Sequence, residues 1–299
     1  MRSTRVLQNR LSLKLGVLGK VRLHPLLLGL VALAVGVGLW KSVVVLFLLV
    51  MLHELGHAAV AEYLGYEVEE VSLLPFGGVA KMSLGNIGFM PRHEAFIAIA
   101  GPVVNFLLIF VSYILWLTHF WSHSFFLTVV HMNLWIALFN LLPAMPLDGG
   151  RILRAARSRS IGFETATVEA YRLGLSLGLV LLVLGVVAIW AGYAHVGLII
   201  LAVFLLFSSW MGIRGLRMET VRFLDAKRRQ NGGIDEVRLL AVNEMSTVRD
   251  VVRRFGPNRY HVVYVLNDKG SIIDEIEEDE LLSAVFAGRW LSTLGEVRS

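Results

Sequence analysis

Cysteine is absent from the 299-residue sequence, and its absence excludes both disulfide bonds and thiolate metal sites. Any metal site in this chain must therefore use histidine and carboxylate ligands. Charged residues are also scarce: they make up 17% of the chain, against about 25% in an average soluble domain. Hydrophobic residues make up 56%, and the mean hydropathy is +0.67. This composition excludes an ordinary soluble domain and predicts a membrane protein.

The net charge of +5 does not predict nucleic-acid binding, because the basic residues lie where apolar segments end. No cleavable signal peptide is expected either. The apolar run at 26–40 follows a basic start, but no small-residue cleavage site separates it from Lys41. We therefore expect this first apolar segment to stay in the membrane.

Six apolar segments approach the roughly 20 residues that a helix needs to cross a bilayer. They lie at 24–40, 42–65, 94–118, 125–142, 168–190 and 193–212. With the N-terminus in the cytoplasm, the inward-facing segments carry the clusters of Lys and Arg, and the outward-facing loops carry only Lys41. This asymmetry predicts six transmembrane helices with both termini in the cytoplasm.

The segment at 67–91, between the second and third spans, has a different pattern. Short β-rich runs flank Pro75-Phe76-Gly77-Gly78, and the paired glycines suit a turn because they tolerate positive φ. Two placements stay open for this β-hairpin. It is either a surface hairpin on the cytoplasmic side or a re-entrant hairpin that offers a strand edge inside a protein cavity.

The composition changes from apolar to mixed after residue 212. We predict a six-helix membrane domain at 1–212, a linker at 213–238 and a small soluble α/β domain at 239–299. Within the last of these, the pattern predicts helices at 247–255 and 278–287, strands at 261–266 and 271–276, and Ser246 as a helix cap.

The second span contains His53-Glu54-Leu55-Gly56-His57, an H-E-x-x-H pattern. Residues four apart lie on one face of a helix, so the two imidazoles can hold one cation together. Glu54 can take a proton from a water that the metal activates and later deliver it to a leaving amine. Such polar residues are costly inside a bilayer. The alternative is a structural hydrogen-bond network between helices, the role that we expect for His131 and Asn133 in the fourth span.

A catalytic zinc site usually has a third protein ligand. The fourth span ends in Asn140-Leu141-Leu142-Pro143-Ala144-Met145-Pro146-Leu147-Asp148-Gly149-Gly150, where the prolines must break the helix. Irregular backbone at membrane depth survives only where protein covers it or where it lines a cavity. We therefore predict Asp148 as the third ligand. The alternative is a loop aspartate at the membrane surface.

Helix geometry predicts the side from which this site is reached. His53 follows Lys41 by twelve residues, or about 18 Å, which places it just cytoplasmic of the middle of a core about 30 Å thick. Asp148 approaches from the cytoplasmic end of its span. The site should therefore open toward the cytoplasm.

The H-E-x-x-H helix and the N-x-x-P-x-x-P-L-D-G-G segment together resemble the site-2 protease family of intramembrane metalloproteases. Leu74-Pro75-Phe76-Gly77-Gly78, His24-Pro25 and Gly101-Pro102 support the resemblance, which covers nearly the whole chain. It implies zinc held by His53, His57 and Asp148, with Glu54 as general base. It further implies substrate contacts at Asn140 and Pro143, and at Phe76 in a membrane-re-entrant loop.

Within this family, the chain looks most like the members that process the precursor of a mother-cell sigma factor during sporulation. That resemblance implies hydrolysis of a membrane-associated precursor from the cytoplasmic side and control by inhibitory membrane proteins. It also implies a bacterial membrane, in the closest case the membrane around the forespore. A homo-oligomer remains an open alternative to a monomer.

The C-terminal domain resembles a single cystathionine-β-synthase-type (CBS) module, which in this family is linked to nucleotide sensing. The chain departs from the module's usual pattern, because Asp274-Glu275-Ile276-Glu277 stands where a glycine and a threonine flank two hydrophobic residues. The added acidity opposes a phosphate, so ATP binding by this domain is not expected.

Two other functions fit parts of the pattern. A transporter could use the same His and Asp residues along a divalent-cation or proton path. A catalytically idle membrane scaffold could use its tail to sense a ligand, but the intact metal motifs argue against it. A transporter would tolerate Glu54→Gln in part, whereas hydrolysis would not. The sequence therefore favours an enzyme.

Overall fold

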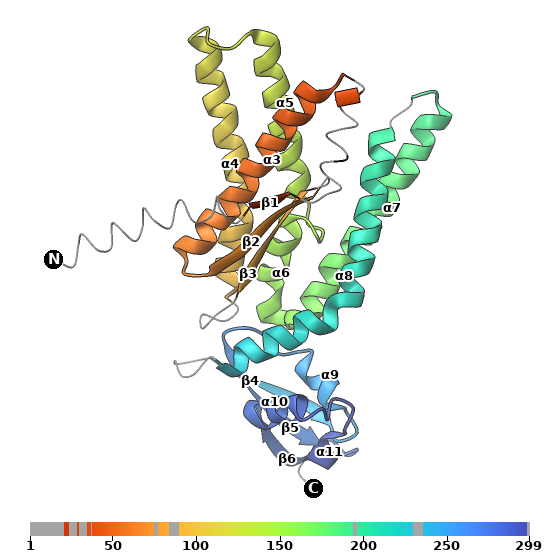
Figure 1. Cartoon of the computed structure of the whole chain (residues 1–299). Coiled ribbons are helices and arrows are strands. Elements are labelled where there is room, and N and C mark those ends of the chain that lie inside the picture. The colour runs from red at the N-terminus through yellow and green to blue at the C-terminus, as the bar shows by residue number, and fades with distance from the viewer. Residues whose placement is uncertain are drawn as a thin grey trace, which may run out of the picture. The chain divides into compact units, whose positions relative to one another are not determined.

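The computed structural model describes residues 21–23, 29, 35–36, 38–74, 77–83, 90–193, 196–229 and 236–297. Over these ranges the chain is mostly helical (Figure 1). It forms two compact units. The first consists of residues 1–85, 93–142 and 147–152, and the second of residues 86–92, 143–146 and 153–299.

Four helices of the described ranges are long and apolar enough to cross a membrane: α3 (Trp40–Tyr63), α4 (Pro91–Leu117), α7 (Phe163–Trp190) and α8 (Val196–Arg229). They correspond to the second, third, fifth and sixth predicted spans. The fourth predicted span coincides with α5 (His123–Asn140), whose 18 residues include His131, Asn133 and Asn140 and which is not one of the four. The first predicted span lies largely outside the described residues. A count of six spans therefore stays a prediction.

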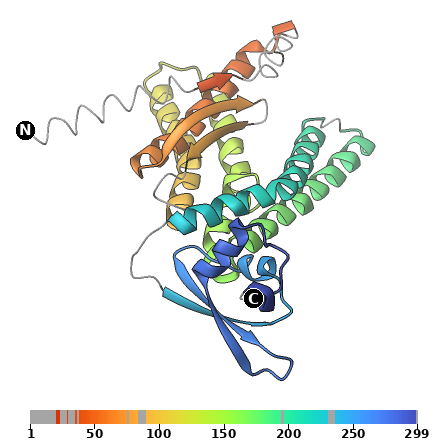
Figure 2. The same ribbon diagram turned by 60° about the horizontal axis from the view of Figure 1, so that its bottom comes forward.

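Unit one contains the predicted hairpin as β2 (Glu67–Leu74) and β3 (Gly77–Ser83), paired antiparallel with Leu74 opposite Gly77. The sequence did not indicate a third strand, β1 (Val21–Leu23), which pairs parallel with β2. The sheet order is β1-β2-β3, and the hairpin packs beside α3 (Figures 1 and 2). Phe76 lies outside the described residues, so the proposed re-entrant position stays a prediction.

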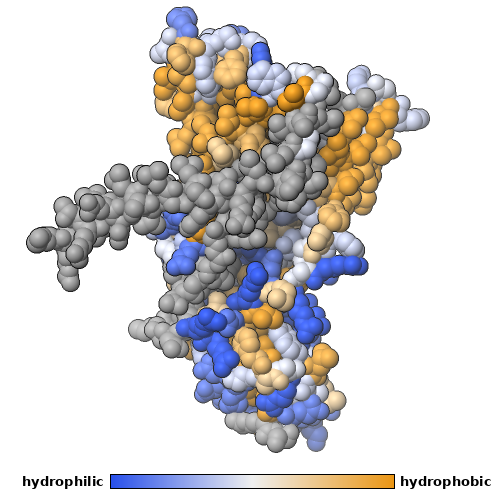
Figure 3. Space-filling view, in the orientation of Figure 1, coloured by the Kyte–Doolittle hydropathy of each residue, from blue (hydrophilic) through white to orange (hydrophobic). Residues whose placement is uncertain are grey.

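Unit two contains α7 and α8, which pack against each other along their lengths. Their outer faces are strongly apolar, and Leu179, Val183 and Val186 are all more than half exposed. Figure 3 shows hydrophobic side chains gathered over α4 and α7. Apolar surface of this extent is unfavourable in water and suits contact with lipid.

The C-terminal elements form a three-stranded sheet in the order β4-β5-β6, with β4 and β5 parallel and β5 and β6 antiparallel. Both predicted strands and both predicted helices of this region are confirmed within a few residues. The sequence did not indicate β4 or the short helix α11. The elements are β4 (Glu236–Asn243), α9 (Val248–Val252), β5 (Arg259–Leu266), β6 (Ile272–Glu277), α10 (Glu278–Phe286) and α11 (Leu294–Val297) (Figure 2).

The predicted cap at Ser246 is wrong, because Thr247 caps α9. The Thr247 side chain accepts a hydrogen bond from the Asp250 backbone N–H, and the Asp250 carboxylate accepts one from the Thr247 backbone N–H. This capping box satisfies two donors at the start of the helix. The hydrogen bonds from Thr247 hold the pKa of Asp250 below its ordinary value.

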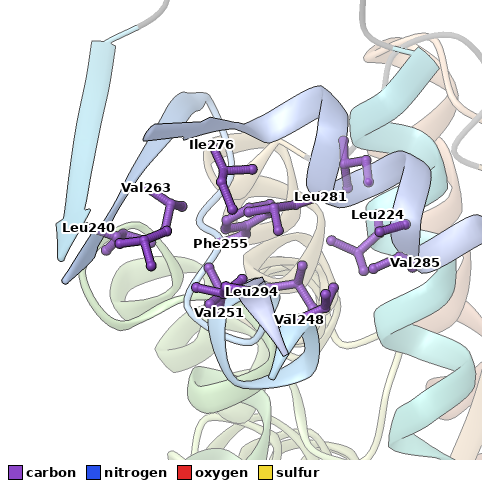
Figure 4. Packing of buried hydrophobic residues seen from close by; sticks show 14 of the residues in the cluster. Leu224, Leu240, Val248, Val251, Phe255, Val263, Ile276, Leu281, Val285 and Leu294 are labelled. Carbon is purple, nitrogen blue, oxygen red and sulfur yellow. The ribbon is translucent and has the colours of Figure 1, made fainter. Parts of the chain in front are cut away.

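The segment predicted as a linker is helical over most of its length, since α8 continues past residue 212 to Arg229. Phe223 and Leu224 of α8 belong to the same hydrophobic core as Val263, Ile276 and their neighbours in the C-terminal elements (Figure 4). Phe163 at the start of α7 stacks on Phe223, with ring centroids 4.5 Å apart. The ends of α7 and α8 therefore complete the core of the C-terminal domain.

A buried polar contact reinforces this packing. Glu278 Oε1 lies 3.0 Å from Lys227 Nζ of α8, and Glu278 Oε2 accepts a hydrogen bond from His261 Nδ1 at 2.6 Å. The Gly256 backbone N–H donates to His261 Nε2 at 3.2 Å, so this imidazole is neutral with its proton on Nδ1. Burial, opposed by Glu278, lowers the pKa of His261. The neutral form is therefore stable at physiological pH.

Candidate metal centre

Four polar residues predicted from the sequence are buried in the first unit. On α3, His53 is 2%, Glu54 8% and His57 3% exposed, and Asp148, the first residue of α6 (Asp148–Ile161), is 6% exposed. Four-residue spacing places both imidazoles on one face of α3. Burial of so many ionisable groups calls for a compensating partner.

Three of these side chains converge on one point. Asp148 Oδ2 lies 3.1 Å from His53 Nε2 and 3.2 Å from His57 Nε2. The two Nε2 atoms are 3.1 Å apart. Each residue offers one ligand atom. Among the described residues, these three form the group of side chains that could hold a metal ion. The convergence expected from the two motifs is therefore present.

The proton positions on the imidazoles follow from their other contacts. His57 Nδ1 lies 2.6 Å from the Ile97 carbonyl oxygen, which can only accept, so Nδ1 carries the proton. His53 Nδ1 lies 2.6 Å from Asn105 Oδ1 and likewise donates. In the neutral imidazoles, both Nε2 atoms therefore present lone pairs to each other and to the carboxylate. Three acceptors at this separation repel one another unless a cation lies between them.

The donor set fits zinc. Zinc bonds of about 2.0–2.1 Å in a tetrahedron place the ligand atoms about 3.3 Å apart. The separations of 3.1, 3.1 and 3.2 Å in this structure are close to that value. Two neutral imidazoles and one carboxylate leave the fourth position free for water or substrate, as in catalytic zinc sites.

The break between α5 and α6 brings Asp148 to this point. Helix α5 ends at Asn140, and Pro143 and Pro146 interrupt the backbone before α6 begins. A Cβ atom at Gly149 would lie 2.3 Å from the carbonyl oxygens of Leu141 and Leu142. Only glycine allows the first turn of α6 to lie so close to the end of α5.

Met145, in the middle of this break, belongs to the second unit. The Met145 backbone N–H donates to the Ala170 carbonyl of α7 at 3.0 Å, and its carbonyl accepts from Ser209 Oγ of α8 at 2.9 Å. Both backbone polar groups of this buried residue are therefore satisfied.

Glu54 is buried next to the ligand candidates but is not one of the three that converge. It follows His53 directly on α3, and its charge interacts with His57. A carboxylate at this position can accept a proton from a group held at the centre without occupying a ligand position.

The three predicted substrate contacts are not part of the converging group. The Asn140 amide donates to the Ile136 carbonyl of its own helix at 3.0 Å. Pro143 is exposed, and Phe76 lies outside the described residues. Their roles stay predictions.

Two further buried residues reach the site through hydrogen bonds. Asn105 of α4 accepts from His53, and its amide N–H donates to Asn133 Oδ1 of α5 at 2.9 Å. Asn133 therefore makes the predicted hydrogen bond between helices, whereas His131 is exposed. Asn105 was not predicted from the sequence. It could have been found as a single amide side chain within the apolar segment that forms α4, because such a side chain needs a buried hydrogen-bond partner.

Gly101 of α4 lies directly against the imidazoles. A Cβ atom there would lie 2.4 Å from His57 Nε2 and 2.6 Å from His53 Cε1, which is too close for a non-bonded contact of a carbon atom. The sequence marked this residue only as part of a Gly-Pro pair. Its structural role is to leave room for both rings.

We expect Gly101→Ala to displace the imidazoles and to remove most of the bound zinc, a loss of at least about tenfold in affinity. Alanine favours the helix, so α4 itself should persist. The measurement is zinc per chain in purified protein. The matched control is Gly215→Ala on α8, where an added Cβ meets no atom within 4 Å. Wild-type zinc content in Gly101→Ala would show that the rings do not occupy this position.

Comparison with known proteins identifies relatives of this chain. The model of peptidase family M50 matches residues 41–122 and 117–185, a range that contains all three converging residues. Stage IV sporulation protein FB of Bacillus subtilis is 32% identical over 274 residues, which cover 90% of this chain and 92% of that protein. Zinc metalloprotease MJ0392 of Methanocaldococcus jannaschii is 36% identical over 184 residues, which cover 60% of this chain and 51% of that protein.

Solved structures include a similar fold. The Site-2 Protease from Methanocaldococcus jannaschii matches with a TM-score of 0.53 and 33% sequence identity. The match covers 65% of this chain and 90% of that chain. The similarity therefore extends from sequence motifs to the arrangement of the helices.

Proposed function

The chain belongs to peptidase family M50, the site-2 protease family, and from this premise we propose how its own residues carry out the reaction. It is a multi-pass membrane zinc metalloprotease that acts on a protein substrate. We assign His53, His57 and Asp148 as the zinc ligands and Glu54 as the general base. The observation that carries the assignment is the convergence of three acceptor atoms at 3.1–3.2 Å.

Each residue has a distinct task in peptide-bond hydrolysis. The hydrogen bonds from the two Nδ1 atoms set the tautomer and the ring orientation in which each Nε2 faces the position of the metal. A zinc ion held by His53, His57 and Asp148 would supply Lewis acidity for the attacking water and for the scissile carbonyl. The Glu54 carboxylate accepts the proton of the attacking water and then donates it to the leaving amine. Burial of the site strengthens each of these interactions.

The substrate is proposed to bind as an extended strand. In the described part of the sheet, β3 is paired on one side with β2 and has no partner on the other. A peptide added to this edge would gain backbone hydrogen bonds. We propose that the hairpin is re-entrant, so that the added strand presents one carbonyl to the metal, with Asn140, Pro143 and Phe76 contributing to substrate contact.

We propose that the substrate is the precursor of a sigma factor, processed from the cytoplasmic side during sporulation. The similarity to Stage IV sporulation protein FB supports this assignment, because it covers 92% of that protein. The 90% coverage of this chain also requires that part of the C-terminal domain is included. Inhibitory membrane proteins and a location in the membrane around the forespore belong to the same proposal.

The proposed topology has six membrane spans and both termini in the cytoplasm. In this arrangement the C-terminal domain lies on the side where the substrate arrives. We propose that the elements β4-α9-β5-β6-α10 form a CBS-like domain. The division of the chain at 1–212, 213–238 and 239–299 stays a prediction. Glu275 and Glu277 are exposed on β6, which disfavours a bound phosphate. We therefore propose regulation through this domain without ATP as its ligand.

Family membership disfavours the transporter hypothesis, since it assigns hydrolytic chemistry to the His and Asp cluster. A transporter would also need a continuous polar path. On α3 the buried polar residues are confined to one stretch of five positions.

The substrate assignment is tested by co-expressing the chain with a sigma-factor precursor in a host that lacks related proteases. We expect a shortened product on a gel, with a new N-terminus found by mass spectrometry. The mature sigma factor, which lacks the pro-segment, serves as the control and should remain unchanged. If the precursor stays intact while another membrane-bound peptide is cleaved, the assignment of the substrate is wrong and the assignment of proteolytic activity stands.

A further inference from the structure

A line of hydrogen bonds runs from the metal cluster into the helix bundle. His53 of α3 contacts Asn105 Oδ1 of α4 at 2.6 Å, and Asn105 Nδ2 donates to Asn133 Oδ1 of α5 at 2.9 Å. Asn133 Nδ2 in turn donates to the Val129 carbonyl oxygen at 2.9 Å. Both asparagines have 0% exposure. Asn105 and Asn133 thus connect His53 directly to the backbone of α5.

The direction of this chain of hydrogen bonds is fixed at its far end. The Val129 carbonyl oxygen can only accept, so the NH₂ group of Asn133 must face it. Oδ1 of Asn133 is then left to accept from the NH₂ group of Asn105. Oδ1 of Asn105 in turn faces His53, whose Nδ1 must carry the proton. A flipped amide at either position would place two donors or two acceptors against each other in a buried site.

The two imidazoles depend on different kinds of partner. His57 Nδ1 donates to a backbone carbonyl, that of Ile97, which no side-chain substitution removes. The partner of His53 is the side-chain amide of Asn105, which could turn either its oxygen or its NH₂ group toward the ring. The tautomer of His53 therefore depends on how neighbouring side chains orient this amide, whereas the tautomer of His57 does not.

We propose that Asn105 and Asn133 are positioning residues that set the tautomer of His53 and hold its Nε2 lone pair toward the metal. Asn105 acts directly, and Asn133 acts by fixing the orientation of the Asn105 amide. The proposal rests on the proposed function, because it assumes that His53 binds zinc. Groups that orient a histidine ligand in this way typically change metal affinity 10–100-fold when they are removed.

The proposal predicts an unusual order of variants at position 105. Asn105→Leu has a similar size but no acceptor, and should lower zinc affinity about 10–100-fold. Asn105→Asp keeps an acceptor for His53 Nδ1 and should retain much more zinc affinity than Asn105→Leu, although its second oxygen then faces Asn133 Oδ1. If Asn105 only filled space, the order would reverse, since leucine keeps the packing and a carboxylate adds a buried charge.

The second prediction concerns coupling between the two asparagines. Asn133→Leu should lower zinc affinity about tenfold in the wild-type chain, because the Asn105 amide loses its orientation. In the Asn105→Asp background the same substitution should cause no loss of zinc affinity, because a carboxylate has no NH₂ group to direct and the leucine removes the facing Asn133 Oδ1. A purely structural role for Asn133 would give the same loss in both backgrounds.

The experiment is competition with graded chelators on purified full-length protein in detergent, with zinc affinity as the readout. The variants are wild type, Asn105→Leu, Asn105→Asp, Asn133→Leu and the double variant. Zinc affinity of Asn105→Leu at the wild-type level, or a loss in Asn105→Asp as large as that in Asn105→Leu, would overturn the proposal. Where Asn105→Leu does not fold, the retention of zinc by Asn105→Asp still decides it. Absence of zinc from the wild type would instead overturn the proposed function itself.

Discussion

Replacement of Glu54 by glutamine is expected to lower the rate of peptide-bond hydrolysis by about 10²–10⁴-fold while zinc remains bound. Glutamine keeps the size of the side chain and its acceptor oxygen, but it cannot take up the proton of the attacking water. Glu54 is not one of the three converging residues, so the metal should stay in place. The expected result is therefore an inactive protein with a full zinc content.

The measurement combines two readouts on one preparation, cleavage of the precursor over time and zinc per chain. The matched control is Glu62→Gln, the same substitution two turns further along α3, which should cleave at the wild-type rate. Cleavage by Glu54→Gln at the wild-type rate would contradict the general-base assignment. Loss of zinc in this variant would instead make Glu54 a ligand.

Replacement of Asp148 by alanine is expected to remove most of the zinc from the purified protein. Asp148 supplies one of three ligand atoms and the only negative charge among them, so its loss leaves two neutral imidazoles to hold a divalent cation. Metal analysis after dialysis against a weak chelator should fall from about one zinc per chain to a small fraction. Removing a ligand should cost more than removing one of its hydrogen-bond partners, which costs about 10–100-fold.

The control for this prediction is Asp279→Ala, an exposed aspartate in α10. It should leave the zinc content unchanged, because it removes a carboxylate that is far from the cluster in the sequence and accessible to solvent. Full occupancy in Asp148→Ala would remove Asp148 from the metal centre and with it the proposed link between the two motifs.

The metal cluster was predictable from the sequence because its signals are local. Four-residue spacing on a helix places His53 and His57 on one face whatever surrounds them. The prolines before Asp148 force a break, and a charged residue at such a break needs a buried partner. Each of the two motifs needs either a cation or a hydrogen-bonding partner for its buried polar groups, and both therefore indicated the same centre. In the structure their side chains lie 3.1–3.2 Å apart.

The hydrogen-bond partners of these side chains were not predictable, because a hydrogen-bonding residue in an apolar span does not indicate which helix it faces. Asn133 was expected to bond between helices, but the pattern gave no sign that Asn105 connects it to His53. Gly101 illustrates the same limit. A small residue is typical of close helix packing, whereas contact with two imidazoles becomes visible only in three dimensions.

The predicted boundaries of helices and strands were wrong where tertiary packing outweighs local sequence composition. Hydropathy falls after residue 212, and a linker was expected there, yet α8 continues to Arg229. Leu216, Phe223 and Leu224 recur at helical spacing and are buried, which stabilises the helix beyond its apolar part. Strand β1 has three residues, too few for an alternating pattern, so only pairing with β2 defines it.

X-ray absorption at the zinc edge of the purified wild-type protein would show whether the two imidazoles of α3 and the Asp148 carboxylate hold a single zinc ion. We expect about one zinc per chain, a first shell of nitrogen and oxygen at about 2.0–2.1 Å, and outer-shell scattering from two imidazole rings. Zinc without imidazole scattering, or protein that cannot be loaded with zinc, would contradict this expectation.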